Sequence, residues 1–277
     1  MNYGIQNGQI VVFDTSQFDI CHILDSGQVF RYEKAGNIYK IVAKNVICHL
    51  KYENDRVIIN SSNTDFAINY FDLYRDYEPI KNELKKHEYV SKAVNYGNGI
   101  RILNQDPLEV IVSFIISANN NIPRIKGILN RLCERLGEDM GGYRAFPTLE
   151  KMAGKDVNFY KEIGLGYRAE YMVKTIADIK NGFDLDLYHW DTIKARKHLT
   201  TLTGVGRKVA DCILLFAYHK EDVFPMDTWC KRIYRDLGLP VQNNCGNMAD
   251  ILTKKFDKLS GYAQQYLFYY YRENNIL

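Results

Sequence analysis

The chain has 277 residues, of which 46% are hydrophobic, and its formal net charge is +3. This length and composition suffice for one large domain or two with a substantial core. No apolar run approaches the length that spans a bilayer, and the N-terminal residues lack the basic-then-apolar pattern of a signal peptide. We therefore expect a cytoplasmic protein with no membrane partner. Because the net charge is small, any basic binding surface must be local.

The six cysteines are scattered along the chain, and no Cys-x-x-Cys pair occurs. This spacing argues against a secreted disulfide framework and against a zinc or iron–sulfur site built from cysteine alone. We expect reduced thiols in the cytosol. No heptad pattern suggests assembly, so we also expect a monomer.

Short β-branched and aromatic runs between residues 9 and 60 predict an antiparallel sheet. Between the first two runs, Asp25–Gln28 is a turn in which Gly27 would let the backbone approach a ligand closely. An ordinary hairpin or loop turn is the alternative. The expected strands are Ile10–Phe13, Val29–Tyr32, Ile38–Val42, Val46–Leu50 and Val57–Ile59.

Helical spacing replaces the strand pattern from Thr64 onward, and no strand run follows. We therefore predict an α+β protein, with an N-terminal antiparallel β domain over residues 1–90 and a helical domain over residues 91–277. Residues 108–117 are almost entirely apolar and predict a buried central helix. Residues 261–271 predict an aromatic helix, a pattern more typical of core than of binding surface.

Two polar turns in the helical domain carry side chains that could meet nucleic acid. The asparagines at 119–121 favour a cap or turn before the helix that contains Arg124, and their amides could contact bases or phosphates. A plain connector is the alternative. The glycine turn at 163–169 carries Tyr167 and Arg168 at its tip, where they could insert into DNA. Alternatively, Tyr167 packs on the helix that follows.

The segment Gly204-Val205-Gly206 separates a Lys- and Arg-rich helical run from an apolar helical run. A tight turn between two helices needs positive φ, which glycine supplies. The amides at the start of the second helix can then hold a phosphate, directly or through a bound cation. This pattern predicts a helix-hairpin-helix near residues 192–218, although a helix cap and connector would show the same glycines.

Lys208 follows these glycines, and Asp227 comes nineteen positions later. A lysine in the first turn of a helix is unfavourably placed against the helix dipole, so its charged form is less stable there. A neutral amine is what nucleophilic lysine chemistry requires. The alternatives are an ordinary solvated lysine at 208 and a helix N-cap at 227.

Together these residues resemble the helix-hairpin-helix (HhH-GPD) DNA glycosylases, and within them the 8-oxoguanine DNA glycosylase/AP lyase family. The resemblance runs from Gly27 to the C-terminus and is densest at 101–107, 117–124, 164–168 and 202–227. It implies a small sheet domain like that of the TATA-binding protein, followed by two helical lobes with DNA between them.

The resemblance also implies roles for individual residues. Lys208 corresponds to the catalytic amine and Asp227 to the carboxylate that supports it. The Gly27 carbonyl would accept the N7–H of the oxidised base, a hydrogen that guanine lacks. The rest of the base pocket would be Cys212 on its wall, Gln264 on the base edge and Phe268 on the base face.

On the opposite strand, the resemblance implies that Asn119, Arg124 and Arg168 hold the estranged cytosine and that Tyr167 fills the gap in the stack. Gly204, Val205 and Gly206 would hold a DNA phosphate. Trp229 stands where related enzymes carry a phosphate-contacting histidine, so the resemblance does not extend to that contact. The chain also lacks the four-cysteine cluster of the iron–sulfur members, which argues against the endonuclease-three-like and adenine-mismatch branches.

The function implied is excision of 8-oxoguanine opposite cytosine, followed by strand cleavage through a lysine Schiff base. The expected partner is double-stranded DNA containing oxidised guanine, so the protein would associate with the nucleoid through DNA. No metal is expected for the chemistry and no iron–sulfur cluster, although a monovalent or divalent cation could bind at the hairpin. The rivals are an alkylated-base glycosylase, which needs no lysine, and a non-catalytic DNA-binding module.

Overall fold

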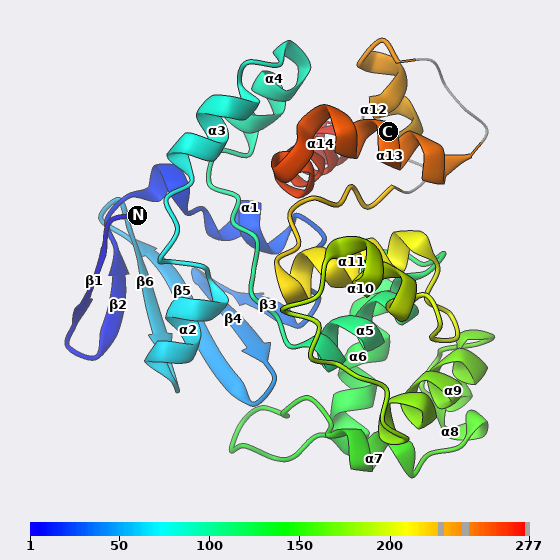
Figure 1. The fold of residues 1–277 in the computed structure, drawn as a ribbon. Helices are drawn as coiled ribbons and strands as arrows, with labels where there is room; N and C mark the ends of the chain where they lie inside the picture. Colours follow the sequence, from blue (N-terminus) through cyan, green and yellow to red (C-terminus); the bar gives the residue numbers. More distant parts are fainter. Residues whose placement is uncertain (227–229, 240–243, 275–277) are drawn as a thin grey trace.

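The computed structural model describes residues 1–226, 230–239 and 244–274 (Figure 1). An antiparallel sheet comes first and is followed by helices, so the predicted α+β class is confirmed. Within these ranges, no helix is both long and apolar enough to cross a membrane.

The N-terminal sheet has six strands in the order β1-β2-β6-β5-β4-β3, and every neighbouring pair is antiparallel. Alternate residues of β4 are buried, as expected for a sheet with one covered face. Two helices pack on that face, α1 (Ile20–Leu24) and α2 (Thr64–Tyr70). The strands are β1 (Tyr3–Gln6), β2 (Gln9–Val12), β3 (Tyr32–Ala35), β4 (Ile38–Ala43), β5 (Val46–Glu53) and β6 (Arg56–Ser61).

The prediction around residues 20–32 was wrong in two respects. Helix α1 was not predicted; it begins where the Asp19 side chain accepts a hydrogen bond from the amide of His22 at 2.8 Å. Val29–Arg31 is not part of a strand, since β3 begins at Tyr32. The reason is Gln28, whose buried amide bonds the Arg101 carbonyl and the Leu103 amide, both at 2.8 Å. This segment is therefore tied to the helical domain.

The helices form two lobes, as predicted (Figure 1). Helix α5 is central to one of them, and its residues 109–116 are all buried, as its apolar sequence predicted. This lobe contains α5 (Pro107–Ser117), α6 (Ile122–Leu136), α7 (Leu149–Ala153), α8 (Val157–Glu162), α9 (Arg168–Lys180), α10 (Thr192–Leu199) and α11 (Arg207–Tyr218). The other contains α3 (Glu78–Leu84), α4 (Glu88–Tyr96), α12 (Cys230–Asp236), α13 (Cys245–Phe256) and α14 (Ser260–Glu273).

A buried arginine fastens the sheet domain to the helical lobes. Arg101 is fully buried, and its guanidinium donates to the carbonyl oxygens of Gln17, Phe71, Asp72 and Arg75. Four backbone acceptors thus satisfy a charge that would otherwise be expensive to bury.

The expected domain boundary at residue 90 stays a prediction. Leu73 packs in the hydrophobic core of the sheet domain and Tyr77 in that of the helices, while Phe30 packs with the helices and Leu103 with the sheet.

Candidate active site

The predicted helix-hairpin-helix is present, with α10 and α11 joined by the turn that contains residues 204–206. Gly204 has a φ of +85°, and a Cβ there would lie 2.9 Å from the Cβ of Tyr171, so both conformation and packing require glycine. Val205 is buried and anchors the turn, while Gly206 caps α11 with no side-chain hydrogen bond. The first amides of α11 are therefore left uncapped by a side chain, as a phosphate site requires. The phosphate contact itself stays a prediction.

A small cavity of about 50 Å³ lies beside the start of α11. Its walls come from the loop after α1, from α5, α11 and α14, and from the segment just before residue 227. The predicted base-pocket residues and the predicted nucleophile all line it, namely Gly27, Lys208, Cys212, Gln264 and Phe268. Residues separated by more than 230 positions in sequence therefore meet at one site.

Lys208 is the second residue of α11, and Cys212 lies one turn later on the same side of the helix. The Nζ atom of Lys208 lies 5.3 Å from the ring centroid of Phe114, a pocket residue that the sequence did not single out. Lys208 also lines a second cavity of about 110 Å³, which reaches toward the start of α13. Lys208 therefore lies between two cavities. The predicted partner Asp227 and the residue Trp229 lie outside the described residues.

The close approach of Gly27 to Phe268 explains why glycine is needed in this loop. Gly27 has a φ of +78°, and a Cβ at this position would lie 2.9 Å from the Cε1 atom of Phe268. Both the backbone conformation and the contact therefore disfavour any other residue. Asp25–Gln28 lies between α1 and β3, so it is not a hairpin within the sheet, and the close approach of a ligand to Gly27 stays a prediction.

Gln264 presents an unused hydrogen-bond acceptor at the cavity. Its side chain is 6% exposed, and its Oε1 atom is buried without a hydrogen-bond partner in the part of the chain that the structure describes. A buried acceptor left unpaired destabilises a protein by about 1–3 kcal/mol. Such an atom suits a site that receives a donor from a ligand, for example an N–H group on the edge of a base.

A charged network that was not predicted borders the start of α11. Asp211 is 1% exposed, and it pairs with Arg196 at 2.5 Å and more distantly with Arg207. Arg207 in turn pairs with Asp250 on α13. Burial raises the pKa of Asp211, although the two arginines oppose that shift. The network joins α10, α11 and α13 around Lys208. In the sequence, it could have been recognised only from Arg207 and Asp211, which lie four positions apart and so can pair on one helix face.

The residues predicted for the opposite strand are close together. Asn119 and Arg124 are exposed, and Arg124 donates a long hydrogen bond of 3.4 Å to the Gly164 carbonyl in the second glycine turn. Tyr167 in that turn is 54% exposed, and its ring also meets Tyr171 edge-on at 5.8 Å between centroids. Tyr167 therefore contacts the helix that follows, and its insertion into DNA stays a prediction.

The placement of Arg168 at the tip of the turn was wrong. Arg168 is 3% exposed and donates to the carbonyl oxygens of Ala118 and Asn119 at the end of α5. The carbonyls at the end of a helix lack partners within the helix, so a guanidinium satisfies them. Its predicted contact with cytosine stays a prediction, and in this structure Arg168 fixes the backbone of Asn119.

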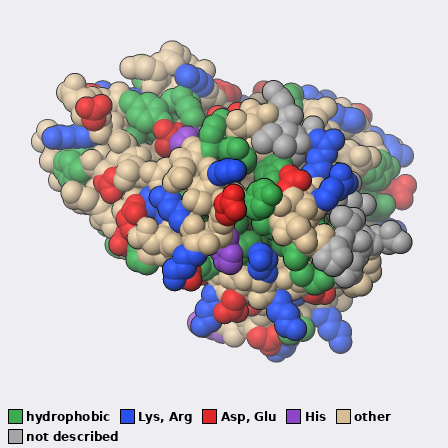
Figure 2. Space-filling view, turned by 90° about the horizontal axis from the view of Figure 1, so that it is seen from above, with side chains coloured by type: hydrophobic (Ala, Val, Ile, Leu, Met, Phe, Trp, Pro, Cys, Tyr) green, Lys and Arg blue, Asp and Glu red, His purple; other side chains and the backbone are tan. Residues whose placement is uncertain are grey.

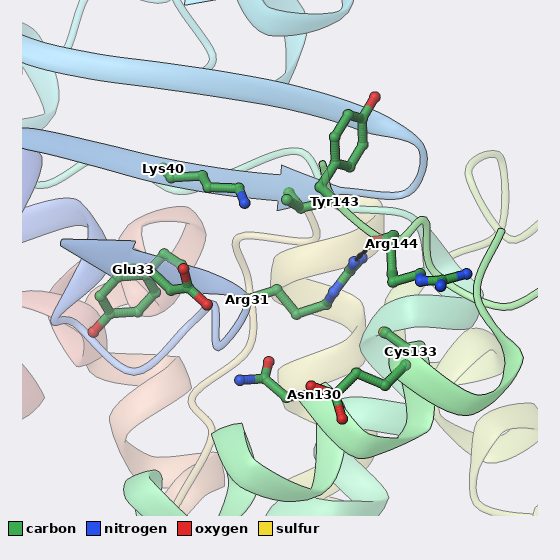
Figure 3. Close-up of a pocket in the computed structure, with 10 residues that line it drawn as sticks. Arg31, Glu33, Lys40, Asn130, Cys133, Tyr143 and Arg144 are labelled. Atoms are coloured by element: carbon green, nitrogen blue, oxygen red, sulfur yellow. Dashed lines mark hydrogen bonds between the residues drawn. The ribbon is translucent and has the colours of Figure 1, made fainter. Parts of the chain in front are cut away.

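Another cavity, of about 190 Å³, lies between β3, β4, α6 and the loop at 139–144 (Figure 3). Arg31 points into it and is held by Glu109 at 3.2 Å and by the Arg144 carbonyl at 2.6 Å. Burial raises the pKa of Cys133 on its wall to about 12, so this thiol is not a nucleophile at neutral pH. Side chains of both charges surround this cavity. Its buried cation, the Arg31 guanidinium, already forms an ion pair with Glu109.

The surface charge agrees with the small net charge. On the face shown in Figure 2, basic side chains form separate groups and no continuous basic surface. Within the described ranges, no cluster of three or more His, Cys, Asp or Glu side chains could hold a metal ion. The cation expected at the hairpin stays a prediction.

Comparison with known proteins agrees with this geometry. Residues 10–111 match the N-terminal domain of 8-oxoguanine DNA glycosylase, and residues 112–258 match the HhH-GPD superfamily of base excision DNA repair proteins. The structure of the Clostridium acetobutylicum 8-oxoguanine glycosylase/lyase bound to dsDNA is similar over 99% of both chains, with a TM-score of 0.93 and 37% sequence identity.

Curated relatives match over shorter stretches. An N-glycosylase/DNA lyase of Saccharomyces cerevisiae is 35% identical over 56% of this chain and 46% of its own length. One from Arabidopsis thaliana is 31% identical over 66% of this chain and 55% of its own length. The chain therefore spans about half the length of these relatives.

A small antiparallel sheet, two helical lobes and a hairpin that presents a lysine to a pocket are typical of helix-hairpin-helix base excision proteins. The chain belongs to the 8-oxoguanine DNA glycosylase family within the HhH-GPD superfamily. The predicted resemblance is thereby confirmed.

Proposed function

We propose that this protein is a bifunctional glycosylase and AP lyase that excises 8-oxoguanine from double-stranded DNA. The observation that carries the proposal is the cavity at the start of α11. It joins the Lys208 amine to a glycine backbone, an unpaired amide acceptor and an aromatic ring. The related Clostridium acetobutylicum enzyme was crystallised with DNA containing cytosine opposite 8-oxoG, which supports this substrate.

The chemistry begins with the neutral form of Lys208. Its amine attacks C1′ of the flipped nucleotide, the C1′–N9 bond breaks, and the base leaves with the bonding electrons. Asp227 stabilises the positive charge that develops on the sugar. The C1′–O4′ bond then opens as O4′ takes up the proton that the nitrogen loses, and the resulting Schiff base acidifies the C2′ hydrogen. Loss of that proton expels the 3′ phosphate and cuts the strand.

Discrimination between 8-oxoguanine and guanine rests on the carbonyl of Gly27. Its carbonyl accepts the N7–H of 8-oxoguanine, whereas guanine presents a lone pair at N7. A guanine in the site would therefore leave the carbonyl unpaired and facing another acceptor, which costs about 1–3 kcal/mol or more. The Oε1 atom of Gln264 accepts from the other edge of the base, and Phe268 stacks on its face.

The cluster of Asn119, Arg124 and Tyr167 serves the other strand. Tyr167 is exposed and carried on a glycine turn, so it can enter the gap that the flipped base leaves. Arg168 holds the Asn119 backbone in place for contact with the estranged cytosine. The proposal also includes a cytoplasmic monomer, nucleoid association through DNA, a structural cation at the hairpin and no iron–sulfur cluster.

Borohydride trapping tests the proposal. Wild-type protein mixed with a duplex containing 8-oxoguanine opposite cytosine should form a covalent adduct on reduction, and Lys208→Gln should form none. Lys51→Gln, on strand β5 of the sheet, is the matched control and should trap normally. Release of alkylated bases without an adduct would favour the alkylation-repair rival. DNA binding with no cleavage, unchanged in Lys208→Gln, would favour the non-catalytic module.

A further inference from the structure

Helix α14 carries a row of side chains that runs past the cavity. Gln264 and Phe268 line the cavity, and Arg272 follows one turn later. Residues four apart lie on the same side of a helix, so the three side chains are stacked along one face. Arg272 therefore lies next to Phe268, on the side away from Gln264.

The loop that contains Gly27 is fastened to α14 at two points. The Nε2 atom of Gln265 donates to the Ser26 carbonyl at 2.7 Å. The Nη2 atom of Arg272 donates to the Asp25 carbonyl. These are the two peptides that precede Gly27, so they set the direction from which its own carbonyl emerges. Gly27 has no side chain that could hold the loop, so these contacts from α14 help to fix its conformation.

The guanidinium of Arg272 also lies close to two residues of the predicted base site, Gly27 and Phe268. Its Cζ atom lies 5.5 Å from the ring centroid of Phe268. Its Nη1 atom lies 3.6 Å from the position that a Cβ on Gly27 would take, and Cε1 of Phe268 lies 2.9 Å from the same point. One side chain thus contacts the predicted hydrogen-bonding loop and the predicted stacking ring.

Packing alone does not account for an arginine here. Nη1 is buried and has no hydrogen-bond partner among the residues that the structure describes. Nε and Nη2 both pair with Glu273, which balances the charge. An apolar side chain of similar length would fill the space without burying an unpaired donor. The arginine therefore carries an energetic penalty beside the site, offset by its hold on the Asp25 carbonyl.

We propose that Arg272 is a positioning residue for recognition of the oxidised base. It holds the Gly27 carbonyl and the Phe268 ring at a fixed separation, so that a purine with a hydrogen on N7 meets both at once. Arg272 acts through these two groups and does not touch the base. This inference rests on the proposed function, and it concerns base recognition only, since an abasic site presents no base to hold.

The test compares two single-turnover reactions of the same protein. One substrate is the 8-oxoguanine duplex, with excision measured after alkaline work-up, and the other is the same duplex with a preformed abasic site. Arg272→Met should slow excision at least about tenfold, equal to about 1.4 kcal/mol in the barrier. Cleavage at the abasic site should stay within about twofold of wild type. Arg272→Lys, which keeps one donor for the Asp25 carbonyl, should recover part of the excision rate.

Arg56→Met is the matched control, because Arg56 also lies over an aromatic ring, that of Phe13 at 5.2 Å, but in the sheet domain. It should change neither reaction. Equal slowing of both reactions in Arg272→Met, or no slowing of excision, would overturn the inference. If Arg272→Met does not fold, the ratio of excision to cleavage in Arg272→Lys decides in the same way. If the wild type cleaves abasic DNA but excises no 8-oxoguanine, the proposed function fails and this inference falls with it.

Discussion

Replacing Gly27 with alanine should close the proposed base site and leave the protein folded. An L-residue in a left-handed conformation costs about 1–2 kcal/mol, and Gly27 has a φ of +78°. The new Cβ would lie 2.9 Å from Cε1 of Phe268. Carbon atoms pack at about 3.5–4.0 Å, so the loop or the ring must move by at least about 0.6 Å.

That displacement takes the Gly27 carbonyl and the Phe268 ring out of register with a bound base. Loss of one hydrogen bond from a buried base N–H costs about 1–3 kcal/mol. Single-turnover excision of 8-oxoguanine should therefore slow by about 5–150-fold. Cleavage at a preformed abasic site should be nearly unaffected.

Gly8→Ala separates the effect on the pocket from the effect on the backbone. Gly8 has a φ of +76°, and nothing lies within 4 Å of a Cβ at that position. Both variants should lose stability in urea unfolding, Gly27→Ala more so because of its contact with Phe268, but only Gly27→Ala should lose excision. Wild-type excision by Gly27→Ala, or equal slowing in Gly8→Ala, would refute the argument.

Three further predictions concern other parts of the chain. Arg101→Met should lower the free energy of unfolding in urea by more than about 3 kcal/mol, because it leaves several buried carbonyl acceptors without a donor. A change below about 1 kcal/mol would contradict this. Tyr167→Ala should leave the thermal midpoint almost unchanged, since the ring is 54% exposed, yet weaken base flipping reported by 2-aminopurine fluorescence beside the lesion; unchanged flipping would count against a wedge. Burial lowers the pKa of His219 from its usual 6.5, so the folded state favours the neutral ring. Stability is then fully present above about pH 6.5 and declines as the pH falls, and urea unfolding of His219→Asn between pH 7.5 and 5 should show a shallower decline than wild type.

The sequence by itself determined the features that depend on neighbours along the chain. The alternation of β4 and β5, the apolar run of α5 and the glycine turn before α11 follow from local periodicity and backbone conformation. The pairs Lys208–Cys212 and Gln264–Phe268 follow from the helical repeat, which places residues four apart on one face. The roles of these residues came from resemblance to a family and not from spacing.

Tertiary structure alone decided which of these local features meet. Gly27 and Phe268 are 241 positions apart, and no pattern in either segment could show that a Cβ between them has no room. The same holds for Arg168, which looks exposed on a glycine turn but is buried because the end of α5 supplies acceptors for its guanidinium. The contact of Arg272 with the loop before Gly27 could not be predicted for the same reason. Hydrogen bonds to distant backbone carbonyls leave no periodic trace in the sequence, since every residue carries the same carbonyl.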